Sequence, residues 1–337
     1  WTTNGGGSWP VTANWQGGVD ASGADGIADF STVSPAADAT VSLDGARSIG
    51  GMIFGNAGFS NNWILNSGSG GSLSLDIGTT GDPTITVNGG GAILNTPLLG
   101  VDGLVKAGPG SLTLAASNSY TGLTAVNAGT LQVTGIVSAG SPVNVGASGT
   151  LTGNGALGSH LTVNGNVAPG TGGIGTLTVG GKLTLAGTAT MEIHKTSATC
   201  DKISGSSSTT FGGTLTVSNL AGTLAAGDKF ILFPSSAYTG AFTTINLPAL
   251  TGGLEWDTSG LLVDGSILVG FDAAITGHPS NQSVGQGVSA TFSVTANGLP
   301  VPVYQWQVST NGGGSWTDIN GATSSSHNTG ATVSGDS

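Results

Sequence analysis

Residues 103–133 read GLVKAGPGSLTLAASNSYTGLTAVNAGTLQV, and this stretch decides the fold. It contains two segments in which apolar and polar residues alternate, Leu112-Thr113-Leu114 and Leu131-Gln132-Val133. Alternation with a period of two is typical of a β-strand that is buried on one face. Leu131 follows Leu112 by 19 residues, and Leu151 follows Leu131 by 20. This spacing indicates a β-solenoid, in which the chain returns one layer up after a few short strands and turns.

Similar alternating segments recur along the chain from about residue 84, between turns rich in Gly and Asn. We predict that their apolar side chains point into the core of a solenoid. The predicted core positions are Leu112, Leu114, Leu131, Val133, Leu161, Val163, Leu177, Val179, Leu183 and Leu185. A set of antiparallel meanders or sandwiches also has short strands at regular spacing, so the spacing alone leaves this second architecture open.

The composition narrows both the fold class and the range of partners. Gly accounts for 62 of the 337 residues, and charged residues for only 7%. We expect an all-β fold, because Gly, Ser, Thr, Val and Asn are poor helix formers. The net charge is −11 with only 6 Lys and Arg residues, so the chain cannot neutralise a phosphate backbone and nucleic acid is excluded as a partner. No apolar run approaches roughly 18 residues, so we predict no membrane-spanning segment.

Residues 103–133 closely resemble the autotransporter-associated β-strand repeat. The resemblance rests on Lys106, Gly108, Gly110, the segment Tyr120-Thr121-Gly122 and the segment Ala128-Gly129-Thr130-Leu131, which occupy the usual places of that repeat. Further motifs similar to passenger domains are NVAPGTGGIGTLTVGGKLTL (166–185), FILF (230–233) and GLEWDTSGLLVDGSILV (253–269). The resemblance implies a right-handed parallel β-helix on a bacterial surface or secreted from the cell, and it implies no particular activity.

The first 65 residues differ from the repeats, because they hold Trp1, Trp9, Trp15 and Trp63. A solenoid leaves its first coil unpaired, so we expect residues 1–65 to form a cap and the first coils, with the tryptophans packed inside. An exposed tryptophan platform on which sugar rings stack is the alternative. Residues 66–270 are then the parallel β-helix itself.

Beyond the β-helix the pattern changes, and residues 271–337 resemble a cysteine-free bacterial immunoglobulin-like domain. His278-Pro279 is expected on the first strand of this domain, and Trp306 is expected as the core tryptophan of the third. The likeness stops at Ser337, before the last two strands of such a sandwich. We therefore expect either that the natural chain continues or that a neighbouring molecule supplies the open edge, and we predict Trp306 and Trp316 as interaction residues.

Two groups of acidic residues are candidate sites. Glu255 and Asp257 lie two apart, hence on one face of an extended strand, where two carboxyl groups could serve a sugar-cleaving reaction. The competing interpretation is a solvated strand face with Trp256 inside. Asp20, Asp25 and Asp29 offer clustered oxygen ligands for Ca²⁺, although their spacing matches no known calcium loop.

The remaining motifs carry little chemistry. The histidines are far apart and lack the spacing of a zinc site; they are His160, His194, His278 and His327. Residues 170–175 satisfy the pattern G-x-G-x-x-G, but they lie among solenoid turns with no helix expected after them, so we predict no dinucleotide site. Cys200 is a single cysteine, which excludes an internal disulfide framework and a cysteine-rich zinc site. Apart from Ca²⁺ at the aspartates, we predict no cofactor.

These observations favour a non-enzymatic structural or adhesive protein, extracellular or at the bacterial cell surface. In this hypothesis a rigid β-helix displays immunoglobulin-like modules and binds a glycan or another cell-surface ligand. Self-association through the incomplete C-terminal sandwich would extend it into filaments. The alternative is a carbohydrate-binding or polysaccharide-degrading β-helix protein, in which Glu255 and Asp257 are the catalytic residues.

Overall fold

The computed structural model describes residues 1–78 and 81–331, and its regular structure is almost entirely β. The chain divides into two compact units. Unit 1 comprises residues 1–223, 230–248 and 259–267, and unit 2 comprises residues 224–229, 249–258 and 268–337. In the described ranges, the helical segments are two 3₁₀ turns, η1 (Thr12–Asn14) and η2 (Ser259–Leu262), and no helix is long and apolar enough to cross a membrane.

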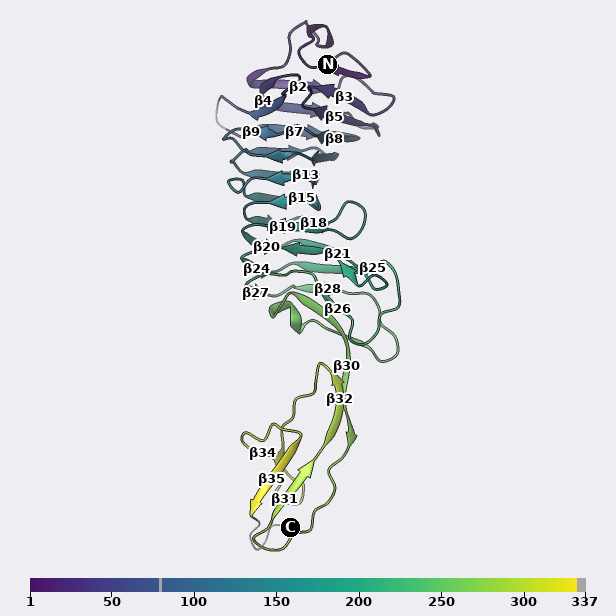
Figure 1. Ribbon diagram of the computed structural model, residues 1–337, viewed down its shortest axis with the longest axis vertical. Helices are drawn as coiled ribbons and strands as arrows, with labels where there is room; N and C mark the ends of the chain where they lie inside the picture. The colour runs from purple at the N-terminus through teal and green to yellow at the C-terminus, as the bar shows by residue number, and fades with distance from the viewer. Residues whose placement is uncertain (79–80, 332–337) are drawn as a thin grey trace. The chain divides into compact units, whose positions relative to one another are not determined.

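Unit 1 is a parallel β-helix whose short strands stack layer upon layer (Figure 1). The strands of its large sheet are β1 (Gly6–Ser8), β2 (Gly23–Phe30), β3 (Ala39–Ser42), β4 (Ala46–Phe54), β5 (Asn62–Asn66), β6 (Ser72–Leu75), β7 (Thr84–Val87), β8 (Gly91–Leu94), β9 (Leu98–Leu99), β10 (Leu104–Ala107), β11 (Ser111–Leu114), β13 (Thr124–Val133), β15 (Val143–Gly153), β17 (Leu161–Val163), β18 (Asn166–Pro169), β20 (Lys182–Leu185), β21 (Thr188–His194), β22 (Thr199–Cys200), β24 (Ser208–Phe211), β25 (Thr214–Asn219), β27 (Tyr238–Gly240) and β28 (Thr244–Asn246). A five-stranded parallel sheet contains β12 (Ser117–Asn118), β14 (Ile136–Val137), β16 (Ala156–Leu157), β19 (Thr176–Val179) and β23 (Lys202–Ser204). The alternation in the sequence therefore belongs to stacked parallel coils, and the antiparallel alternative is wrong for this unit.

The register places identical positions of successive repeats above one another. Leu131 of β13 pairs with Leu112 of β11 on one side and with Leu151 of β15 on the other. Each of these side chains is completely buried, while Gln132 beside Leu131 faces outward and is half-buried. All ten core positions predicted from the alternation are buried, so that prediction is confirmed.

Glycines allow the coils to turn and to approach one another. Gly129 lies at the bend within β13 with φ +65°, and a Cβ there would come within 2.5 Å of the carbonyl oxygens of Gly108 and Gly110 in the preceding coil. A side chain at this position would therefore meet both an unfavourable backbone conformation and a steric clash.

The N-terminal end of the β-helix is closed by an aromatic cluster. Trp1, Trp9, Trp15 and Trp63 are all at most 6% exposed, and the ring of each lies next to that of Phe30. The ring centroids of Trp1 and Trp15 lie 4.9 Å apart at an interplanar angle of 87°, an edge-to-face arrangement that is favourable for aromatic pairs. The tryptophans thus pack inside, and the alternative of an exposed stacking platform formed by these residues is wrong.

Four strand pairs of unit 2 are antiparallel. The strands that remain are β26 (Lys229–Ile231), β29 (Glu255–Asp257), β30 (Ser266–Gly277), β31 (Ser289–Ser293), β32 (Thr295–Leu299), β33 (Gln307–Val308), β34 (Thr317–Asp318) and β35 (Ser326–Ala331). β30 pairs with β29 and with β32, β31 pairs with β35, and β33 pairs with β34.

The expected strand positions in unit 2 are only approximately met. β30 ends at Gly277, so His278-Pro279 follows that strand, and Trp306 lies immediately before β33. Residues 332–337, at the end of the predicted sandwich, lie outside the described residues. The immunoglobulin-like interpretation therefore stays a prediction.

Candidate functional site

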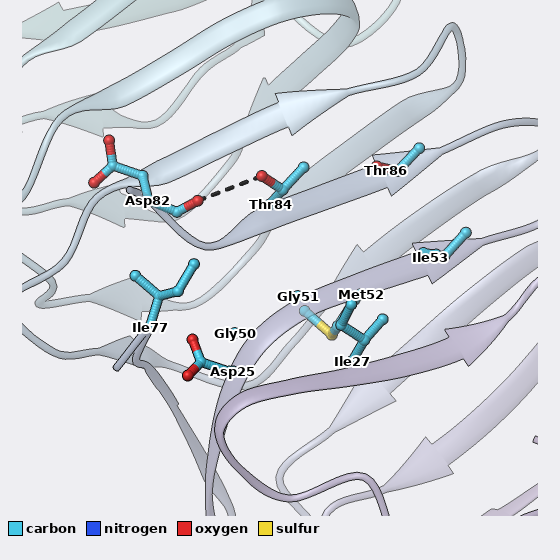
Figure 2. A pocket seen from close by; sticks show the side chains of 10 residues that line it. All are labelled: Asp25, Ile27, Gly50, Gly51, Met52, Ile53, Ile77, Asp82, Thr84 and Thr86. Carbon is cyan, nitrogen blue, oxygen red and sulfur yellow. Dashed lines mark hydrogen bonds between the residues drawn. The ribbon is translucent and has the colours of Figure 1, made fainter. Parts of the chain in front are cut away.

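A cavity of about 270 Å³ lies on unit 1 between β2, β4 and β7 (Figure 2). Asp25, Ile77 and Asp82 lie at one end of it, and Ile53 and Thr86 at the other. An irregularity in the pairing of β2 with β4 between Gly23 and Ile27 displaces Asp25, which adopts φ +63°.

The carboxylate of Asp25 is occupied by the fold. Its Oδ1 accepts a hydrogen bond from the backbone N–H of Gly78, over 3.1 Å. Position 50 next to Asp25 requires a glycine, because a Cβ at Gly50 would lie 2.7 Å from the Cα of Asp25. The second carboxylate at the cavity, Asp82, likewise accepts a backbone hydrogen bond, and the rest of the lining consists of threonine, glycine and apolar residues. This lining suggests no reaction.

The same role recurs at other aspartates of unit 1. Asp82 accepts a hydrogen bond from the N–H of Gly103 at 2.9 Å, and Asp102 accepts one from Ile77 at 2.8 Å. Asp38 accepts one from the N–H of Asn62 at 2.7 Å, and this bond holds the pKa of Asp38 below its usual value. These carboxylates satisfy backbone donors at the bends between coils, where the strand ladders stop. A lone Asp in a turn does not reveal which amide it meets, so the sequence pattern alone does not predict these bonds.

The three aspartates predicted to bind Ca²⁺ are not brought together. Asp20 forms an ion pair with Arg47 at 3.1 Å, and Asp29 accepts hydrogen bonds from the backbone N–H (2.8 Å) and the hydroxyl (2.6 Å) of Ser31. Asp25 binds Gly78 as described above. Across residues 1–78 and 81–331, no group of three or more His, Cys, Asp or Glu side chains could hold a metal ion. The structure gives no support to the calcium hypothesis.

Lys106 is the most unusual charged residue of the β-helix. Its side chain is completely buried in the position that apolar residues occupy in neighbouring coils, where it pairs with Ile85 and Val126. Its Nζ donates hydrogen bonds to the carbonyl oxygens of Ala107 (2.9 Å), Gly108 (2.8 Å) and Ala128 (3.0 Å). Burial lowers its pKa to about 8. Since Ala128 belongs to the next coil, Lys106 joins two layers at their bend.

Cys200 and Asp201 lie between β21 and β23, where β22 pairs antiparallel with β21 and interrupts the parallel coils. The buried carboxylate of Asp201 accepts hydrogen bonds from the N–H groups of Gly175 (2.8 Å) and Glu192 (2.7 Å), and burial raises its pKa to about 6. Burial likewise raises the pKa of the Cys200 thiol to about 11, and this thiol donates to the carbonyl oxygen of Ile231 at 3.3 Å. A thiol with a raised pKa is a poor nucleophile near neutral pH. Asp201 and Cys200 therefore have a structural role.

Glu255 and Asp257 lie on β29 of unit 2 with Trp256 between them, as the alternation predicts. β29 pairs with the part of β30 that contains residues 268–270. The pair lines a cavity of about 380 Å³ that also contains Asp272 and Phe271. The structure thus adds a third carboxylate that the sequence spacing does not reveal, because Asp272 is 15 residues further along the chain than Asp257. Catalysis by Glu255 and Asp257 stays a hypothesis.

Two histidines and the glycine-rich turn have structural roles in the β-helix. Nδ1 of His160 accepts a hydrogen bond from the N–H of Lys182 at 2.8 Å, and Nδ1 of His194 accepts one from Ser197 at 3.3 Å. Residues 170–175 connect β18 with β19, so a strand follows this turn and the helix of a dinucleotide site is absent there.

The two predicted interaction tryptophans of unit 2 differ in their surroundings. Trp316 is 61% exposed. Trp306 is half-buried, its Nε1 donates to the carbonyl oxygen of Ser324 at 2.8 Å, and its ring lies 6.0 Å from that of His327. Trp306 also lines a cavity of unit 2.

Comparisons with known proteins point to one kind of bacterial protein. A family model described as Passenger-associated-transport-repeat matches residues 104–133. The chain is 31% identical over 190 residues to the "Adhesin BmaC autotransporter" of Brucella suis, a match that covers 54% of this chain and 5% of that protein. It is 46% identical over 81 residues to the "Extracellular serine protease" of Serratia marcescens, covering 24% of this chain and 8% of that protein. The chain thus matches only a small fraction of the length of these curated relatives.

The matched repeat begins at Leu104 and ends at Val133, so it coincides with β10, β11, β12 and β13, one complete coil and the start of the next. It includes Lys106, which joins these coils. Residues 104–133 thus match a passenger-type repeat within a parallel β-helix, and the chain is similar to an autotransporter adhesin and to an extracellular protease. These similarities place the chain at the bacterial surface or outside the cell.

Proposed function

We propose that this chain is a non-enzymatic, adhesive part of a bacterial surface protein, which holds a ligand-binding surface away from the cell. The observation that carries the proposal is the similarity over 54% of the chain to a protein named as an autotransporter adhesin. Stacked coils support this role, because a solenoid offers an extended surface built from repeated units.

The arrangement of the charged side chains supports binding without catalysis. In the β-helix, the strongly perturbed groups Lys106 and Asp201 are saturated by backbone partners and face the interior. A catalytic acid or base instead needs access to a substrate atom. Side chains that face outward on the coils are mostly Thr, Ser and Asn, for example Thr130, Thr150 and Thr188. Such groups suit recognition of an uncharged surface ligand.

Adhesion of cells to the immobilised chain tests the proposal. We expect beads coated with the wild-type chain to retain cells that carry the ligand, and beads coated with the urea-unfolded chain to lose this retention. Equal retention by the folded and the unfolded chain, or by neither, would overturn the proposal.

The enzymatic alternative rests on the Glu255, Asp257 and Asp272 cavity and on the similarity to an extracellular protease. Incubation of the chain with a protein substrate and with a panel of polysaccharides tests it. We expect no cleavage products. Depolymerisation that disappears in Glu255→Gln would establish the polysaccharide-degrading function, and proteolysis would establish the other.

A further inference from the structure

A second cavity of unit 2 has the dimensions and the lining of a small-molecule site. It measures about 330 Å³ and lies between β30 and the segment 302–306. Sites for small ligands are concave, mostly apolar and typically at least about 300 Å³, with a few polar groups that fix the orientation of the ligand. Here the half-buried residues Pro279, Val294 and Ala296 provide apolar walls. Tyr304 and Trp306 provide aromatic ones.

The lining excludes a charged ligand. Among the residues that the structure describes, no Asp, Glu, Lys, Arg or His lines it, although the whole chain carries a net charge of −11. An ionised ligand placed there would lose hydration without gaining a counter-charge, which is unfavourable. The occupant that fits must therefore be uncharged.

Two polar groups at the cavity are available to a ligand. Nε2 of Gln305 donates to the carbonyl oxygens of Trp306 and Ile319, both at 2.9 Å, and this fixes the amide and leaves its Oε1 as an acceptor. Within the part of the chain that the structure describes, neither this Oε1 nor the hydroxyl of Tyr304 has a hydrogen-bond partner. Both can therefore bind the hydroxyl groups of a ligand.

The indole of Trp306 is held in place before any ligand arrives. Its Nε1 donates to Ser324, its backbone N–H donates to the carbonyl oxygen of Ala322 at 2.9 Å, and its carbonyl oxygen accepts from the N–H of Ile319 at 2.9 Å. A ring fixed in this way loses little conformational entropy on binding, so it is a preorganised surface for stacking.

We propose that this cavity binds one neutral sugar ring of a surface glycan. Such a ring has an apolar face of C–H groups, which the Trp306 and Tyr304 rings can cover, and a rim of hydroxyl groups, which Gln305 Oε1 and the Tyr304 hydroxyl can bind. The inference rests on the proposed adhesive function and specifies its ligand class. Glu255 and Asp257, the pair considered above for sugar cleavage, line a different cavity.

Calorimetric titration of the whole chain with tetrasaccharides tests the proposal. The neutral probes are tetramers of glucose, galactose, mannose and N-acetylglucosamine, and the charged probe is a tetramer of galacturonic acid. We expect at least one neutral tetramer to bind and the charged one not to bind. Trp306→Ala should weaken binding by about tenfold or more, as for a stacking residue at the centre of a site.

Two further variants separate binding from folding. Tyr304→Phe removes one oxygen atom and keeps the ring, so it should weaken binding several-fold while the far-ultraviolet circular dichroism and the urea unfolding curve stay unchanged. Trp316→Ala removes an exposed tryptophan that does not line the cavity, and it should leave binding unchanged.

Several results would overturn the proposal. One is the absence of binding by all neutral tetramers, and another is equal weakening by Trp316→Ala and Trp306→Ala. A third is a concentration-dependent dimer that Trp306→Ala abolishes, because it would show that a second copy fills the cavity. If Trp306→Ala leaves cell retention intact while the urea-unfolded chain loses it, the glycan site is refuted and the adhesive function stands.

Discussion

Leu131→Ala tests the packing of the β-helix at a position whose surroundings are fully defined. The Leu131 side chain is completely buried and lies between Leu112 and Leu151 of the adjacent coils. Truncating a buried Leu to Ala costs about 2–5 kcal/mol, the sum of the lost transfer free energy and the cavity that remains. The coils above and below are fixed by backbone ladders and cannot close the cavity, so we expect a loss of about 3–4 kcal/mol.

Urea unfolding at pH 7, followed by far-ultraviolet circular dichroism, measures this loss. Gln132→Ala is the matched control, because Gln132 is the next residue of β13 and faces outward; its amide oxygen accepts one hydrogen bond, from the Thr113 hydroxyl at 3.2 Å. We expect this control to change the free energy of unfolding by about 0.5 kcal/mol or less. If the two variants lose the same stability, or if Leu131→Ala loses less than its control, the inward orientation of Leu131 is refuted.

Three further variants test single features of the structure. Gly129→Ala should lower the free energy of unfolding in urea by at least about 3 kcal/mol, because of the positive φ and the 2.5 Å approach to Gly108 and Gly110. Gly17→Ala is the control: Gly17 has φ +84° but open space around it, so the loss should be only about 1 kcal/mol. Equal losses would contradict the close approach of the coils. Because the pKa of Asp201 is raised in the folded state to about 6 from 3.8, the folded protein binds protons more tightly, so the free energy of unfolding attributable to this residue should rise by about 1 kcal/mol as the pH falls from 7 to 5. This rise is the difference between the wild type and Asp201→Asn, and identical pH profiles would show that the pKa of Asp201 is not raised. Burial lowers the pKa of Lys106 to about 8 from 10.5, so the unfolded chain binds more protons than the folded one around and above pH 8. The free energy of unfolding should therefore rise by about 1 kcal/mol between pH 8 and 9 in the wild type but not in Lys106→Met. A rise of the same size in Lys106→Met would show that Lys106 does not cause it.

The repeat architecture could be predicted from the sequence because it depends on local alternation. A buried Leu and an outward Gln side by side, as at Leu131 and Gln132, fix which face of a strand points inward, and a spacing near 20 residues fixes the layer above. The burial of Trp1 and Trp9 also followed, since the first coil of a solenoid must be closed.

The contacts between distant turns were beyond the reach of the sequence. Asp20, Asp25 and Asp29 are close in sequence and suggested a common metal site, yet each binds a different partner, among them Arg47 and Gly78. Only the stacking of coils decides which backbone amide lies opposite a carboxylate. The same holds for the cavity at Trp306, whose walls include β30 and a segment about 30 residues further along the chain.

The claim on which all others depend is that neighbouring coils stack in parallel register. Thr130 and Thr150 are register partners with half-buried, outward side chains. The residues above them are Asn166 and then Thr188, so Thr188 lies three strand spacings, about 14 Å, from Thr130. Thr130→Cys can therefore be paired with Thr150→Cys as the test and with Thr188→Cys as the control.

Cross-linking of these cysteine pairs with a short bifunctional thiol reagent at pH 7.5 measures the register directly. The native Cys200 should not interfere, because it is buried and its pKa is raised to about 11. The parallel β-helix predicts rapid intramolecular cross-linking of the 130/150 pair and none of the 130/188 pair. Failure of the 130/150 pair to cross-link, or equal cross-linking of both pairs, would contradict the stacked coils.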